Sequence, residues 1–166
     1  MNGMDPINGV ENALRDLVEV VMTRKIGPQW ISSAGVSVER VEKWKERRAE
    51  EPKRRPGGST EDRLLYYSDF SDVVSIIQKN WSGEFKTCID ERKRFDVYTD
   101  RLAAFRNPDA HSRMLRPFEE HLVEGICGEL IQEITVYLSS GAGGPEPEYF
   151  ARIEEVTDTS ALVSQE

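Results

Sequence analysis

Residues 10–22 read VENALRDLVEVVM, and this stretch decides the fold class. Its apolar residues recur at steps of three and four, at Val10, Leu14, Leu17, Val18, Val21 and Met22. That spacing places them on one side of an α-helix, because a helix turns once in about 3.6 residues. We predict a helix over residues 8–25 with one apolar stripe, ended by Gly27-Pro28.

The same helical spacing continues along the chain, and no segment alternates apolar and polar residues as a half-buried strand does. We therefore predict an all-α fold, a bundle of four to five helices over residues 8–140. The further predicted helices are residues 37–52 with Ser37 as N-cap, a third helix from Ser71 as N-cap to Gly83, residues 90–106, and a helix from Pro117 to near Gly141.

Residues 141–166 have a different composition. Gly141 to Pro147 reads GAGGPEP, which is typical of a linker. Residues 142–166 contain six Asp and Glu residues and a single cation, Arg152. We predict either a flexible acidic tail or the start of a further domain of a longer protein.

The composition indicates a cytoplasmic protein. The net charge of −8 argues against a protein that coats nucleic acid nonspecifically, although a local basic cleft is compatible with it. Segment 39–56 carries eight Lys or Arg against five Glu, and we interpret it either as a solvated face or as an RNA track. No run of apolar residues is long enough to predict a membrane span. Cys88 and Cys127 lack metal-ligand spacing, and we expect them to be reduced thiols.

One loop stands out for chemistry. Residues 105–113 read FRNPDAHSR and contain one of only two histidines in the chain. Pro108 removes a backbone donor and pushes Asn107 out of the helical region, so we expect a kink or a new helix start here. A helix start offers unpaired amides and the positive end of a dipole, which suit a phosphate. The other histidine, His121, is expected to be a solvated helix residue.

The segment Arg106-Asn107-Pro108-Asp109-Ala110-His111 resembles the signature of the HEPN superfamily (higher eukaryotes and prokaryotes nucleotide-binding). That signature is Arg, four to six residues, then His, often with Asn after the Arg. The chain is similar to one branch, named after a nuclear RNA-quality-control endoribonuclease, over roughly residues 10–139. There, a phrase like Tyr67-Ser68-Asp69-Phe70-Ser71-Asp72 opens a helix that ends near an Asn-Trp pair, here Asn80-Trp81.

The resemblance implies a metal-independent endoribonuclease that needs no cofactor and works as a homodimer. The RNA 2′-hydroxyl attacks the adjacent phosphate and leaves a cyclic phosphate. His111 would be the general acid and base, and Arg106 would stabilise the charged phosphorane. Asn107 and Arg113 would bind phosphate or RNA. Asp109 departs from a purely basic motif and either pairs with Arg113 or weakens phosphate binding.

Three functional hypotheses remain open from the sequence. The first is an RNA-cutting enzyme in antiviral defence, a toxin–antitoxin system or RNA processing. The second is a noncatalytic module that dimerises and tethers a partner protein or a C-terminal effector domain. The third is a HEPN partner that controls a nucleotidyltransferase. Under the simplest alternative, Arg106 forms a surface ion pair and His111 is an ordinary helix-end residue.

Overall fold

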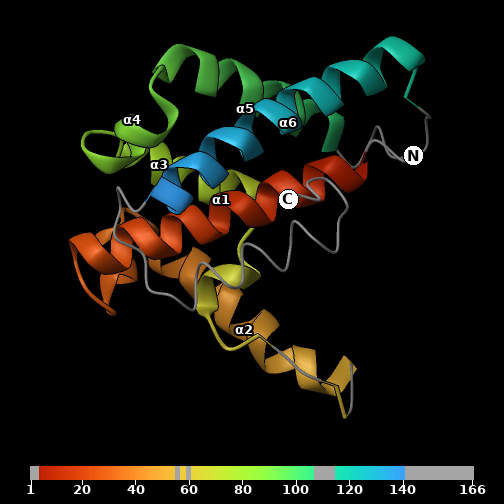
Figure 1. The fold of residues 1–166 in the computed structure, drawn as a ribbon. Coiled ribbons are helices and arrows are strands. Elements are labelled where there is room, and N and C mark those ends of the chain that lie inside the picture. The colour runs from red at the N-terminus through yellow and green to blue at the C-terminus, as the bar shows by residue number, and fades with distance from the viewer. Residues whose placement is uncertain (1–3, 55–56, 59–60, 107–114, 141–166) are drawn as a thin grey trace.

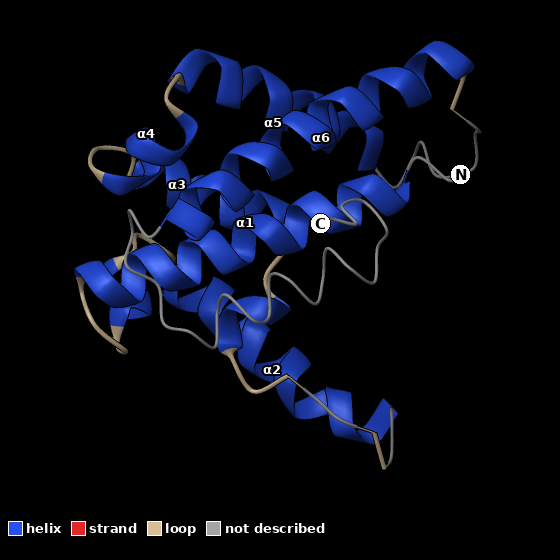
Figure 2. Cartoon of the chain, in the orientation of Figure 1, coloured by secondary structure: helices blue, strands red, loops and turns tan. Residues whose placement is uncertain are grey.

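The computed structural model of the chain describes residues 4–54, 57–58, 61–106 and 115–140, and over these ranges its regular structure is helical with no strand (Figure 2). The all-α prediction is therefore confirmed for the described residues, although they form six α-helices rather than four to five. The elements in order are α1 (Met4–Lys25), η1 (Trp30–Ser33), α2 (Val38–Arg54), η2 (Leu64–Tyr67), α3 (Phe70–Lys79), α4 (Glu84–Ile89), α5 (Arg92–Arg106) and α6 (Pro117–Ser140). None of the described helices has the length and apolarity needed to cross a bilayer.

Helix α1 runs through the middle of the fold, with α6 beside it (Figure 1). It packs most extensively on α6, and it also packs on α3 and η2. The predicted single stripe was too narrow, because Val20 is buried as well as the expected apolar residues. The helix also starts at Met4, four residues before the predicted start. A helix covered on several sides buries more than one face, so a single apolar stripe accounts for only part of its buried surface.

Helix α2 points away from the body of the fold and packs on η2 (Figure 1). The Ser37 hydroxyl accepts the Arg40 amide at 3.2 Å, so the predicted N-cap is confirmed. Trp44 is fully buried, and its indole N–H donates to the Asp72 carboxylate of α3 at 3.0 Å. The remaining α2 surface is mostly exposed, as the sequence predicts.

Helix α3 begins earlier than predicted. Its N-cap is Asp69, and Ser71 lies inside the helix. The Asp69 side chain accepts the backbone N–H of Asp72, and the Asp72 side chain accepts the backbone N–H of Asp69. This reciprocal capping box satisfies two unpaired amides at once, which favours Asp69 over Ser71 as the start.

The stretch after α3 differs most from the prediction. Helix α3 ends at Lys79 instead of Gly83, and Trp81 lies beyond it with its ring 5.6 Å from that of Phe95. The six-residue helix α4 was not predicted at all. It is bounded by Gly83 at φ 95° and Asp90 at φ 79°, two backbone turns into the left-handed region. One and a half turns carry too few apolar residues for periodicity to reveal.

Helices α5 and α6 follow the predicted order. Helix α6 starts at Pro117, as predicted, and the Arg116 amide donates to Glu119 at 2.8 Å ahead of it. Helix α5 ends at Arg106, the last described residue before the gap at 107–114. The predicted break at Asn107-Pro108 and the predicted tail over 141–166 lie outside the described residues.

Candidate functional site

Arg106 is the one predicted site residue within the described part of the chain, and it is the last residue of α5. Buried Phe95, Leu102 and Phe105 anchor the helix that carries it. Its Nη1 lies 2.6 Å from Glu11 Oε1 and donates to Asn8 Oδ1 at 3.2 Å. Both partners belong to α1, so the guanidinium at the end of α5 is fixed against the central helix.

Glu11 is a buried acid, with only 7% of its surface exposed. Its Oε2 accepts a hydrogen bond from Arg15 Nη2 at 2.6 Å, while Oε1 faces Arg106 as an ion pair without the alignment of a hydrogen bond. Arg15 is 8% exposed, and it also donates to the backbone carbonyl of Ser68 next to η2. The carboxylate therefore lies between two guanidinium groups, which offsets part of the cost of burying it. We call Glu11, Arg15 and Arg106 the arginine–glutamate cluster.

The polar row on α1 continues one turn further along. Asp16 is 1% exposed and accepts a hydrogen bond from the Tyr66 hydroxyl of η2. The Arg63 guanidinium lies 4.4 Å from the centre of the Tyr66 ring, a cation–π distance. Burial raises the pKa of Glu19, against the opposing effects of the nearby Arg63 charge and of hydrogen bonds. Polar side chains thus line α1 where it faces η2.

The spacing of the apolar residues does not reveal this polar row. Charged residues at 11, 15 and 19 recur one helical turn apart, with Asp16 next to Arg15, directly beside the apolar positions of α1. Buried Glu, Arg and Asp are rare enough that periodicity assigns them to solvent. The signal that could have found them is their i,i+4 spacing next to a helix face that is itself buried.

The other predicted site residues, Asn107, His111 and Arg113, lie outside the described residues. Their segment, 107–114, joins the end of α5 to the residues just before α6. Arg106 is thus brought together with Glu11 and Asn8, whereas its geometry relative to His111 stays a prediction.

The remaining charged and reactive candidates have ordinary surroundings. In segment 39–56, Arg40 pairs with Asp69 and Asp72, and Arg47 pairs with Asp69, which favours a solvated, ion-paired face over an RNA track. The His121 side chain is 82% exposed, as expected for a solvated helix residue.

Both cysteines are buried and form no disulfide. Burial raises the pKa of the Cys88 and Cys127 thiols to about 12, which makes poor nucleophiles of them near neutral pH. Across the described residues, no group of three or more His, Cys, Asp or Glu side chains could hold a metal ion.

Comparison of the chain with protein-family models, with curated proteins and with solved structures found no match.

Proposed function

We propose that this protein is a HEPN-like, metal-independent endoribonuclease whose catalytic residues are Arg106 and His111. The observation that carries the proposal is the placement of Arg106, the first residue of the Arg-x4-His motif. It ends a helix anchored in the core, and its guanidinium is fixed by Glu11 and Asn8. An arginine fixed before substrate arrives loses little side-chain entropy on gripping a phosphate.

In the proposed reaction, His111 accepts the proton of the RNA 2′-hydroxyl. The 2′-oxygen then bonds to phosphorus, and the bond from phosphorus to the 5′-oxygen breaks. The His111 imidazolium then donates a proton to the leaving 5′-oxygen, so that a 2′,3′-cyclic phosphate and a 5′-hydroxyl remain. Arg106 offsets the charge that grows on the phosphate oxygens, and its planar fork matches their geometry. Asn107 and Arg113 bind the neighbouring phosphate or RNA.

The proposed assembly is a homodimer in the cytoplasm that brings two copies of the motif together. Two copies would place more than one cation around a single phosphate. The proposed setting is antiviral defence, a toxin system or RNA processing. Light scattering at micromolar concentration tests the assembly, and a strict monomer would contradict the composite site.

The test of activity is cleavage of end-labelled RNA by the full chain in EDTA. We expect wild-type protein to cut, and Arg106→Ala and His111→Ala each to lose about 10²-fold or more in rate. His121→Ala is the matched control and should cut like wild type, because its side chain is solvated. Cleavage only with added divalent metal, or full activity of His111→Ala, would contradict the mechanism.

One observation favours a second candidate function, the noncatalytic interaction module. The Arg106 guanidinium is committed to Glu11 at 2.6 Å, and such a contact can serve the fold alone. This module would dimerise and bind a partner, such as a C-terminal effector domain or a nucleotidyltransferase. If wild-type protein cuts no RNA while Arg106→Ala unfolds at lower urea concentration, the module is the better account.

A further inference from the structure

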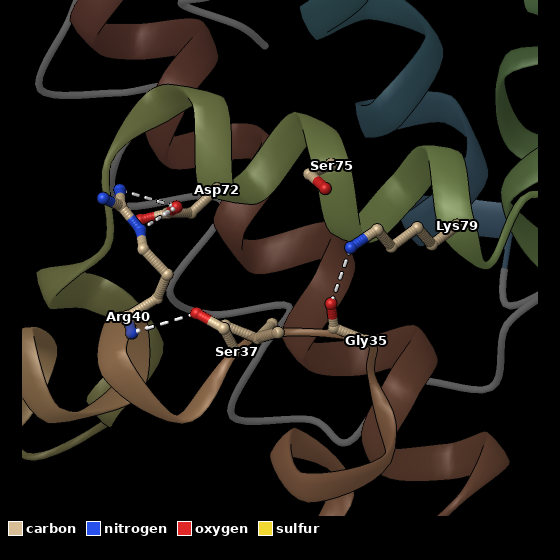
Figure 3. A pocket seen from close by; sticks show the side chains of 7 residues that line it. Gly35, Ser37, Arg40, Asp72, Ser75 and Lys79 are labelled. Carbon is tan, nitrogen blue, oxygen red and sulfur yellow. Dashed lines mark hydrogen bonds and ion pairs between the residues drawn. The ribbon is translucent and has the colours of Figure 1, made fainter.

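A pocket of about 300 Å³ opens between the turn that precedes α2 and the outer face of α3 (Figure 3). It lies outside the arginine–glutamate cluster and shares no residue with it. Three of its α3 residues recur at steps of three and four, which puts them on one face of the helix. The lining residues are Gly35, Val36, Ser37, Arg40, Asp72, Ser75 and Lys79.

The Lys79 side chain is held in place, which is unusual for an exposed lysine. Its Nζ donates to the carbonyl oxygen of Gly35 at 2.7 Å, across the floor of the pocket (Figure 3). Gly35 has φ +87°, and a Cβ there would lie 2.9 Å from Lys79 Cδ, so the stem of Lys79 packs directly on the glycine backbone. The Asn80 side chain adds a second link, donating to the Ala34 carbonyl at 3.2 Å. The turn and the lysine therefore form one preorganised wall.

The only carboxylate that lines the pocket, Asp72, is already paired with an arginine. Asp72 accepts from Arg40 Nε at 2.9 Å and from the Trp44 indole at 3.0 Å, and its side chain is 9% exposed. The Arg40 charge is in turn offset by Asp72 and Asp69. Lys79 forms no salt bridge with any carboxylate among the described residues, so the pocket retains one positive charge.

The other polar groups of the pocket are mainly donors. Ser37 Oγ accepts the Arg40 amide and keeps its own proton to donate. Figure 3 shows the Ser75 hydroxyl on the same side of the pocket as the Lys79 ammonium. An ammonium has three N–H groups, of which the Gly35 carbonyl takes one. A cation held in place with a hydroxyl on its side of the pocket is a chemical match for the oxygens of a tetrahedral oxyanion.

We propose that this pocket binds a phosphate group, as inorganic phosphate or as a small phosphomonoester, with Lys79 as its charged ligand and Ser75 as a hydrogen-bond donor. A water takes about 30 Å³ in the liquid, so the pocket has room for phosphate and for part of an attached organic group. The site is independent of the proposed ribonuclease reaction, and it stands if that reaction fails.

The test is a titration of the full ¹⁵N-labelled chain with sodium phosphate at constant ionic strength, followed by amide shifts. Saturable shifts are expected at Gly35–Ser37 and at Ser75–Lys79. Lys79→Met should weaken binding by about tenfold or more, since a charge-assisted bond is lost, and Ser75→Ala should weaken it by a few-fold. Lys86→Met is the matched control, because Lys86 is an exposed lysine on α4, and it should bind like wild type.

Two parallel titrations identify the ligand. Glycerol phosphate should bind at least as well as inorganic phosphate if the spare volume takes the organic part of an ester, while equal affinity for acetate would contradict a site for a tetrahedral anion. Shifts that never saturate, or binding that Lys79→Met leaves unchanged with the fold intact, would overturn the proposal.

Discussion

Glu11→Gln is the most informative change to the arginine–glutamate cluster, because it keeps the size of the side chain and removes its charge. Glu11 and Arg15 are 7% and 8% exposed, and their contact is 2.6 Å. Removing one partner of a buried pair costs about 3–5 kcal/mol, because the other charge stays buried without compensation. The Arg106 side chain is 31% exposed, so solvent screens its share and puts the expected loss near the lower end, about 3 kcal/mol. For a domain of this size, that loss lowers Tm by about 10 °C.

The assay is urea unfolding of the full chain, followed by circular dichroism at 222 nm. The matched control is Glu42→Gln, the same substitution at a side chain that is 57% exposed and lies 3.4 Å from Lys45. It should cost less than about 0.5 kcal/mol. If Glu11→Gln loses under about 1 kcal/mol of unfolding free energy, or no more than Glu42→Gln, the cluster does not hold α5 against α1.

Three further predictions concern single positions. Because burial raises the pKa of the Cys88 and Cys127 thiols to about 12 from an ordinary 9.0, stability should fall as pH rises above about 9, by about 1 kcal/mol per thiol at pH 10. Urea unfolding at pH 7.5 and at pH 10 measures this. Between these pH values, the unfolding free energy of Cys127→Ala should drop by about 1 kcal/mol less than that of wild type, and an equal drop would contradict a buried thiol. Gly125→Ala and Gly128→Ala should each raise stability by about 0.5–1 kcal/mol in thermal unfolding, because no heavy atom lies near a Cβ added to either; a decrease would mean that this face of α6 is covered in solution. Burial raises the pKa of Glu19, so its stabilising effect belongs to the protonated form and fades as pH rises above its unfolded pKa of about 4.5. The gain in unfolding free energy of Glu19→Gln over wild type should therefore grow between pH 4 and pH 7, and a constant difference across that range would count against this account.

The long helices could be predicted from the sequence, since each buries many apolar residues at one spacing. Pro117 marked the start of α6 to the residue, because a proline at the first helical position fits both its fixed φ and its missing donor. Helix α4 could not be predicted, since its six residues are defined by two backbone turns and by packing on α5 and α6. The Asp69 cap was ambiguous because Ser71 is also a good cap, and only the partner Asp72 decides between them.

The motif of the candidate site remains a sequence prediction, and the contacts that hold Arg106 could not be predicted from the sequence. Arg106 could be selected from its spacing to His111, whereas nothing local to residue 106 indicates Glu11, which is 95 positions away along the chain. Long-range ion pairs depend on how helices pack, and the sequence periodicity that reveals a helix does not give its neighbours. The pocket beside Lys79 has the same origin, since it joins a turn at residue 35 to a helix that ends at residue 79.

The packing of α1 on α6 has a consequence for synthesis on the ribosome. Residues 4–25 leave the ribosome before residues 117–140, yet the surface that covers them most extensively belongs to that later segment. At roughly 5–20 residues per second, α1 waits on the order of ten seconds for its main partner. Contacts between such distant segments slow folding and leave apolar surface exposed to solvent until they form. A chain cut before residue 117 would lose the main cover of α1 and leave that apolar surface exposed.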